Sequence, residues 1–424
     1  MLTGSGQPRD VIATAMARVR RRQIPFLFLL YIVAYLDRIN VGFAALQMNQ
    51  ALGFSARTYS IGAGIFFVSY ALFEVPSNVM LERVGARRWI ARIMISWGIV
   101  SSAMMFVRGP VSFYTLRFLL GAAEAGFFPG IIFYLTRWFP ARERARTMAT
   151  FMTAILVAGV VGSPVSGALL SLSAGGLAGW QWLFLVEGVP SIVLGLVVLR
   201  TLLERPQDAG WLGERERAAL AWCLEEDVRR TGVEHGTVAA AMRSGRVWSI
   251  AAVYFTIPVA LYGIGFFLPQ MIKTASRGSD FQVGLLGAIP YAAAAITMVL
   301  TGRHSDRTGE RRTHVVCAAL VCAAGLIAAA WVTGAAASVA ALSVAMAGLA
   351  SMMGPFWALA TARTSGAGGA AAIALINSVG NTGGFAGPYL LGAVNDATHS
   401  FAAGLVIIAA VVTVGGSLIL AIRE

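Results

Sequence analysis

The stretch that decides the fold is residues 24–46, IPFLFLLYIVAYLDRINVGFAAL, an apolar run with Asp37 and Arg38 near its middle. At a rise of 1.5 Å per residue, a helix of this length crosses the hydrocarbon core of a bilayer. A charge at that depth costs from about 3 to more than about 10 kcal/mol, depending on the scale. Two adjacent charges there therefore indicate a functional site. The alternative is that they pair inside a helix bundle and only fix its packing.

The composition is that of a polytopic membrane protein. The 424 residues are 57% hydrophobic and only 12% charged, with a mean hydropathy of +0.72, whereas soluble domains carry about 25% charged residues. The net charge of +13 comes from residues clustered in short loops, which is a topology signal and not a nucleic-acid surface. The three cysteines and four histidines have no metal-ligand spacing, so we expect no metal and no other cofactor.

Twelve apolar runs of about 20 residues follow one another, each long enough to span a bilayer. They lie at residues 24–47, 58–81, 89–107, 111–137, 146–172, 181–203, 247–272, 281–302, 314–333, 337–360, 369–394 and 400–421. The sequence thus predicts an all-α membrane protein with twelve transmembrane helices in two pseudo-symmetric six-helix bundles. The bundles cover residues 1–203 and 246–424. The mixed charges of residues 204–245 predict a cytoplasmic linker with short amphipathic helices.

Basic residues set the expected orientation. If the N-terminus is cytoplasmic, 27 of the 33 Lys and Arg residues fall in cytoplasmic segments, four in opposite loops, and two, Arg38 and Arg117, inside spans. This asymmetry satisfies the positive-inside rule and predicts that both termini are cytoplasmic.

The second cytoplasmic loop of each half carries the same pattern. Residues 78–88 read NVMLERVGARR and residues 302–312 read GRHSDRTGERR. A glycine permits a left-handed backbone, an acid can face a helix N-terminus, and arginines can bridge to helix ends or lipid phosphate. We therefore expect a gating or structural motif in each half, made of Glu82, Arg83, Gly85, Arg87 and Arg88 in the first and Asp306, Arg307, Gly309, Arg311 and Arg312 in the second.

With these features the chain resembles the major facilitator superfamily over nearly its whole length. The first loop departs from the family pattern, with Asn78 in place of the usual Gly and Glu82 where Asp is frequent. Finer motifs are similar to those of the anion:cation symporter branch: YLDRIN at 35–40, FEVPSN at 73–78, RFLLGAAEAGFFP at 117–129, WFPARER at 138–144 and NSVGNTGGFAGP at 377–388. The resemblance implies a proton symporter in a bacterial inner membrane. Its cargo would be a small organic anion such as a sugar acid, a tartrate-like dicarboxylate or an aromatic carboxylate.

The residues point to the same chemistry. Arg117 and Glu124 are two helical turns apart, so they share one face of a helix and lie about 10 Å apart along its axis. Together with Asp37 and Arg38, these residues make two carboxylates and two arginines. Their four charges sum to zero when all are ionised, which an apolar interior tolerates best. We assign Asp37 and Glu124 to proton coupling, and Arg38 and Arg117 to the anion, because the planar guanidinium binds both oxygens of a carboxylate. Arg117 could instead pair with an acid or act in gating.

Further polar side chains in the spans are candidate substrate ligands, with packing as the alternative for each: Tyr35, Tyr70, Tyr262, Trp357 and Asn377. Glu74, just before Pro76, is expected to hold a bend near a gate, and Glu187 to bond neighbouring helices. The glycines of residues 159–167 indicate close helix packing first, and only weakly an exchange mechanism.

Other function classes fit less well. A drug or metabolite exporter would depend less on Arg38, a membrane sensor would need a larger soluble domain than the linker, and an enzyme would need a nucleophile or metal cluster in the spans. We expect a transporter that is not an enzyme, acts as a monomer, and has protons, the organic anion and the lipid bilayer, but no nucleic acid, as partners.

Overall fold

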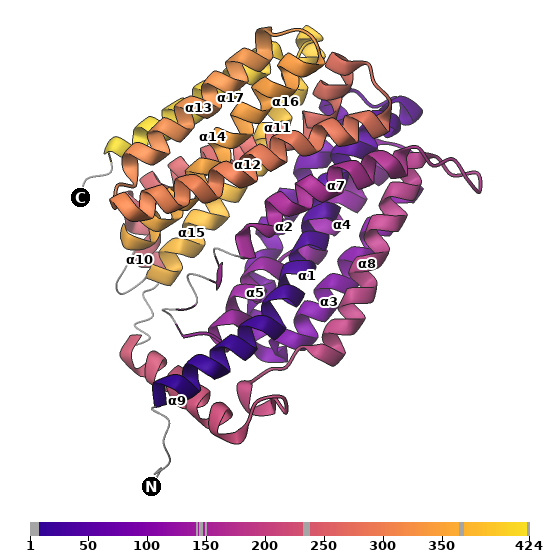
Figure 1. The fold of residues 1–424 in the computed structure, drawn as a ribbon. Helices are drawn as coiled ribbons and strands as arrows, with labels where there is room; N and C mark the ends of the chain where they lie inside the picture. Colours follow the sequence, from indigo (N-terminus) through magenta and orange to yellow (C-terminus); the bar gives the residue numbers. More distant parts are fainter. Residues whose placement is uncertain are drawn as a thin grey trace.

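The computed structural model describes residues 8–140, 143, 147–148, 151–231, 238–363 and 369–421. Within these ranges the regular secondary structure is helical, and ten helices are long and apolar enough to cross a membrane. Figure 1 shows two groups of helices lying side by side, one from each half of the sequence. This confirms the predicted class, an all-α membrane protein of two helical bundles.

The first bundle contains long, apolar helices from the first half of the chain. They are α1 (Pro8–Leu52), α2 (Ala56–Val84), α3 (Ala86–Ala103) with the short η1 (Met104–Phe106), α4 (Pro110–Glu124), α5 (Phe127–Thr136), α7 (Ala154–Leu170) and α8 (Gly179–Thr201). The second bundle contains α11 (Gly245–Ser276), α12 (Asp280–Thr308), α13 (Arg312–Trp331), α14 (Ala335–Arg363), α15 (Gly369–Asn381), α16 (Gly383–Thr398) and α17 (Ala402–Ala421).

Each of the twelve predicted runs corresponds to one of these helices or to a pair of them. The run at 111–137 is divided into α4 and α5, and the run at 369–394 into α15 and α16. The run at 146–172 gives α7, which is shorter than the other spans, and its first residues lie largely outside the described part of the chain. The break between α4 and α5 depends on a glycine: Gly126 has a φ of 86°, which only glycine adopts without strain.

The bundles pack against each other along α7 and α12 and along α2 and α16. Small residues permit this close approach: a Cβ atom added to Gly167 of α7 would lie 2.9 Å from the Cα of Gly284 in α12. Most hydrogen bonds between the bundles lie at the end where α1 and α11 finish. There Gln47 Nε2 donates to Asp280 Oδ2 over 2.7 Å, and Tyr59 Oη donates to the Phe266 carbonyl over 2.9 Å.

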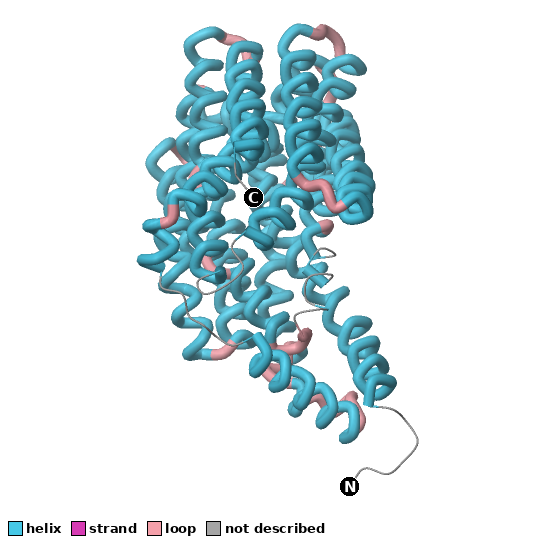
Figure 2. The backbone as a smooth tube through the Cα atoms, turned by 90° about the vertical axis from the view of Figure 1, so that its left-hand side faces the viewer, coloured by secondary structure: helices cyan, strands magenta, loops and turns pink. Residues whose placement is uncertain are grey.

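The first residues of α1 extend beyond the bundle and lie against the linker (Figures 1 and 2). The linker contains η2 (Pro206–Asp208), α9 (Glu214–Thr231) and α10 (Val238–Arg243), so it forms the short helices predicted for it. Arg18 of α1 donates to Glu216 of α9 over 2.9 Å. The residues between α9 and α10 lie outside the described ranges.

Candidate functional site

Arg38 links the two bundles near the middle of the molecule. Its Nη2 donates to Glu124 Oε1 at the end of α4, and its Nη1 donates to the Tyr262 hydroxyl of α11 over 3.2 Å. The Arg38 side chain is 13% exposed and that of Glu124 is 2% exposed. A buried ion pair at this depth is stable only with further hydrogen bonds, and Tyr262 supplies one from the opposite bundle.

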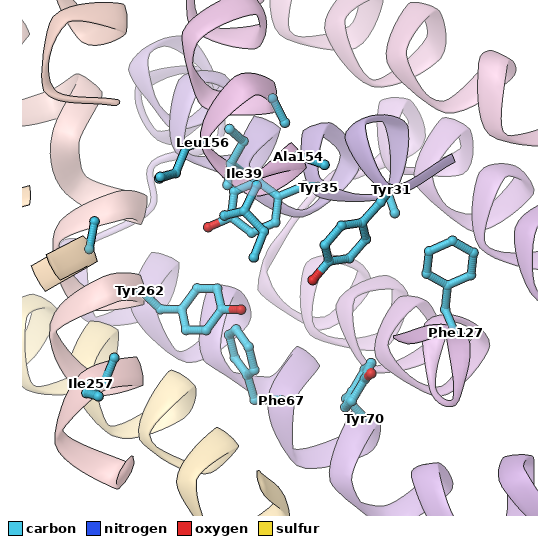
Figure 3. Packing of buried hydrophobic residues seen from close by; sticks show 14 of the residues in the cluster. Tyr31, Tyr35, Ile39, Phe67, Tyr70, Phe127, Ala154, Leu156, Ile257 and Tyr262 are labelled. Carbon is cyan, nitrogen blue, oxygen red and sulfur yellow. The ribbon is translucent and has the colours of Figure 1, made fainter. Parts of the chain in front are cut away.

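Aromatic rings surround this ion pair. The Arg38 guanidinium carbon lies 5.3 Å from the centre of the Phe66 ring and 5.5 Å from that of Tyr70, distances at which a ring face attracts a cation. In Figure 3 the hydroxyls of Tyr31 and Tyr262 point toward the same region, next to Phe67 and Tyr70. Tyr35 is also buried. The structure thus brings Tyr70 and Tyr262 together around Arg38, and Tyr35 interacts with Arg38 electrostatically.

The break between α4 and α5 positions Glu124. Glu124 is the last residue of α4, and the chain then turns through Ala125 and Gly126. Ser77 Oγ of α2 donates to the Ala125 carbonyl over 2.6 Å, and a Cβ atom on Gly126 would lie 2.2 Å from that same Oγ. The turn is therefore held against α2, and this fixes the carboxylate beside Arg38.

Asp37 faces away from Arg38 into its own bundle. Its carboxylate accepts hydrogen bonds from Trp97 Nε1 over 3.0 Å, from Ser101 Oγ over 2.7 Å and from Ser191 Oγ over 2.6 Å, on helices α3 and α8. Three donors satisfy a buried carboxylate without a cation. The four charges expected to meet are thus divided, and among the described residues Arg38 and Glu124 form the one ion pair between them.

Arg117 is bound to the backbone of α2. It is 1% exposed, its Nε donates to the Gly62 carbonyl over 3.2 Å, and its Nη2 donates to the Ala63 carbonyl over 2.9 Å. Its guanidinium carbon also lies 5.0 Å from the centre of the Phe66 ring, so Phe66 stands between the two buried arginines. This geometry favours a structural role, holding α4 against α2, over direct contact with a substrate. The hydrogen bonds of Arg117 to described residues are to backbone carbonyls and not to the acid that was the alternative partner.

The remaining predicted ligands, Trp357 and Asn377, lie on the second bundle around a tyrosine that sequence reasoning missed. The ring centres of Tyr254 and Trp357 are 4.8 Å apart. Asn377 Nδ2 donates to Glu74 Oε1 of α2 over 3.4 Å. Glu74 interacts electrostatically with Arg38, so both Tyr254 and Glu74 belong to the surroundings of the ion pair.

Tyr31 and Tyr254 were not among the predicted ligands, although their spacing in the sequence could have indicated them. Tyr31, Tyr35 and Arg38 follow an i, i+4, i+7 spacing, which places them on one helix face, and Tyr254 precedes Tyr262 by about two turns of α11. Glu74, expected to hold a bend at Pro76, also makes a contact that the sequence did not predict. Its described hydrogen bond is to Asn377 of the other bundle.

The two repeated loops have the expected glycine geometry but different capping acids. Gly85 and Gly309 have φ values of 94° and 71°. In the first loop, Glu204 and not Glu82 accepts from the backbone N–H groups of Ala86 and Arg87, over 3.1 and 2.9 Å. The acid that faces the N-terminus of α3 thus comes from outside the motif.

In the second loop the acid of the motif is paired within the loop. Asp306 Oδ1 lies 2.7 Å from Arg311 Nη1. The cap on α13 comes from Glu310, whose Oε1 accepts from the Thr313 N–H over 3.0 Å. That bond lowers the pKa of the Glu310 carboxyl below its ordinary value, because it favours the ionised form.

Sequence comparison finds a match to the Major Facilitator Superfamily over residues 27–388. A protein of Agrobacterium vitis named "Putative tartrate transporter" is 50% identical over 97% of this chain and 92% of its own length. "Putative metabolite transport protein NicT" of Pseudomonas putida is 40% identical over 96% of this chain and 94% of its own. A "Quinolone resistance transporter" of Acinetobacter baumannii is 38% identical over 96% and 93%.

Among solved structures, an inward-facing bacterial homologue of the human lysosomal transporter Spinster superposes with a TM-score of 0.76 at 16% identity. The superposition covers 99% of this chain and 97% of that one.

Proposed function

The chain belongs to the Major Facilitator Superfamily, a family of membrane transporters and not of enzymes, and from that premise we propose that it imports a small organic anion together with protons. The cargo is a sugar acid, a tartrate-like dicarboxylate or an aromatic carboxylate. The names of relatives at 50% and 40% identity support this class of cargo. The observation that carries the proposal is the buried Arg38–Glu124 pair, which reaches Tyr262 of the second bundle.

Coupling follows from competition for one guanidinium. A substrate carboxylate binds Arg38 through both oxygens and displaces Glu124. A buried carboxylate that has lost its arginine binds a proton more readily, because its charged form is no longer compensated. The anion and the proton are therefore taken up together. Asp37, held by Trp97, Ser101 and Ser191, is the second candidate proton carrier.

Movement of the cargo requires the two bundles to alternate. Arg38 and Tyr262, like Glu74 and Asn377, face each other across the bundle interface. Rocking of one bundle against the other, around a site between them, opens it to each side in turn. In this proposal the division is at residues 1–203 and 246–424, with residues 204–245 as a cytoplasmic linker. The protein works as a monomer in a bacterial inner membrane, with both termini in the cytoplasm.

The experiment that tests the proposal is uptake into proteoliposomes under an imposed proton gradient, acidic outside. The acids to screen are hexonates, tartrates, other dicarboxylates and aromatic acids. We expect at least one to accumulate above its external concentration, and a protonophore to abolish this. The Arg38→Ala variant should neither bind nor accumulate that acid. Uptake that is the same with and without the proton gradient would contradict proton coupling. Normal uptake by Arg38→Ala would contradict substrate binding at Arg38.

A second candidate function is proton-coupled export of drugs or metabolites. The relative named for quinolone resistance favours it. The same vesicles decide between the two functions: a symporter accumulates cargo on the alkaline side of the membrane, whereas an antiporter moves it to the acidic side.

A further inference from the structure

Glu74 is a buried carboxylate that has no role in the proposed coupling of anion and proton. The residue is 5% exposed. Its Oε1 accepts from Asn377 Nδ2 over 3.4 Å, while its Oε2 has no hydrogen-bond partner among the described residues. A buried acceptor without a donor costs about 1–3 kcal/mol, and more when it is charged. Because this unpaired oxygen lies beside the proposed binding site, we expect a hydrogen-bond donor on the bound substrate to pair with it.

The position of Glu74 fits such a donor on the substrate. Tyr70, whose ring lies 5.5 Å from the Arg38 guanidinium carbon, precedes Glu74 by four residues on α2. This places Glu74 about 6 Å further along the helix axis. A carboxylic acid bound to Arg38 by its carboxylate therefore extends its carbon chain toward Glu74 when it lies along α2. Asn377 of the second bundle donates to the same carboxylate, and Tyr254 of that bundle interacts with it electrostatically.

The chemistry of the Glu74 carboxylate limits the kind of hydrogen-bond donor that the substrate can carry. An ionised carboxylate only accepts hydrogen bonds, so Glu74 attracts a hydroxyl or an ammonium and disfavours a carboxylate at that same position of the substrate. An ammonium would cancel one negative charge of the substrate, so an amino monocarboxylate would be a zwitterion without net charge and an amino dicarboxylate would keep only one of its two charges. A hydroxyl donates without changing the charge of the substrate. The bond from Asn377, at 3.4 Å, is longer than the usual range of about 2.7–3.2 Å for N–H···O bonds, so it is readily replaced or shared.

We infer that Glu74, with Asn377, recognises an alcohol hydroxyl of the substrate, so that the protein selects hydroxy acids over the same acids without the hydroxyl. The inference rests on the proposed function and names the substrate class of that same site. Because Glu74 and Asn377 belong to different bundles, a hydroxyl bound between them contacts both halves of the transporter.

Binding of matched acids to the purified protein tests this. The pairs are tartrate and succinate, gluconate and hexanoate, and mandelate and phenylacetate, with aspartate as the ammonium analogue. Apparent dissociation constants come from thermal-shift titration. In the wild type we expect the hydroxylated member of the best-binding pair to bind at least about tenfold more tightly, since a hydrogen bond to a charged group is lost without it. Glu74→Gln should bring the two members to within about threefold.

Glu187→Gln is the matched control. Glu187 is also 5% exposed, accepts one hydrogen bond, from Ser166 Oγ over 2.7 Å, and has a second oxygen without a partner among the described residues. It lies on α8, where it interacts with Ser166, Asp37 and Asn40 and not with Arg38, so Glu187→Gln should keep the preference. Glu74→Asp, which retains the charge, should keep more of the preference than Glu74→Gln and guards against an effect of misfolding.

The outcomes separate the two claims. If no acid of the panel binds the wild type, the proposed function is overturned and the inference with it. If the acids bind but the wild type does not prefer the hydroxyl, the inference alone is overturned. The same holds if Glu74→Gln keeps the preference, if both glutamine variants lose it alike, or if aspartate binds better than tartrate.

Discussion

Replacing Arg38 by lysine separates the shape of the cation from its charge. Lysine keeps the positive charge but carries a single nitrogen, so it cannot contact Glu124 and Tyr262 at the same time in the way that Nη2 and Nη1 of Arg38 do. It also cannot bind both oxygens of a substrate carboxylate. We therefore expect Arg38→Lys to fold and to bind the substrate weakly.

The size of the effect follows from the contacts that are lost. One hydrogen bond between charged groups contributes about 1.5–3 kcal/mol, and each 1.4 kcal/mol is a factor of ten in the dissociation constant. Arg38→Lys should thus weaken binding by about tenfold to about 150-fold. Weaker attraction of a lysine to the ring faces of Phe66 and Tyr70 acts in the same direction.

Arg117→Lys is the comparison variant, because Arg117 is also an arginine inside the bundle but bonds to backbone carbonyls of α2. It should lower the midpoint of thermal unfolding and leave the dissociation constant within about threefold. Substrate binding and thermal unfolding of both purified variants are the assays. The reasoning is refuted if Arg38→Lys binds like the wild type, or if Arg117→Lys weakens binding as much while its stability is unchanged.

Three further variants probe other parts of the account. Asp37→Asn opposes three donors with an amide, so its thermal stability should fall by about 1–3 kcal/mol and its gradient-driven uptake should fall as well; normal uptake would remove Asp37 from coupling. Gly167→Leu meets the backbone of α12 and should reduce transport at least about tenfold, whereas Gly302→Ala, with open space around it, should not; equal activity would show that this contact does not matter. Glu204→Ala should cost about 1–2 kcal/mol of stability as a lost helix cap, measured by thermal unfolding, and an equal loss in Glu82→Ala would contradict the assignment of the cap.

Much of the fold could be predicted because membrane helices are encoded locally. A run of about 20 apolar residues has to be helical in lipid, where each backbone group needs a partner within its own segment. That rule located all twelve runs. It could not locate the breaks inside them, because the turn after Glu124 depends on a contact with Ser77 of another helix.

The candidate site was predictable in part for the same reason. Arg38 and Glu124 are visible as charges in apolar runs, but their pairing is a contact between α1 and α4. Asp37, next to Arg38 in the chain, points to a different side of α1 because successive residues of a helix differ by about 100°. Its hydrogen-bond donors are Trp97, Ser101 and Ser191. They lie on α3 and α8, and the sequence does not show that these helices pack against α1. The helix cap from Glu204 was missed because it comes from far along the chain, after α8.

The central claim is that a carboxylate on Arg38 frees Glu124 to bind a proton. The most direct measurement is proton uptake by the purified protein in weak buffer when a transported acid is added. We predict about one proton taken up per anion bound by the wild type, and none by Glu124→Gln, which should still bind the anion and exchange it. Anion binding without proton uptake in the wild type, or unchanged uptake in Glu124→Gln, would contradict the claim.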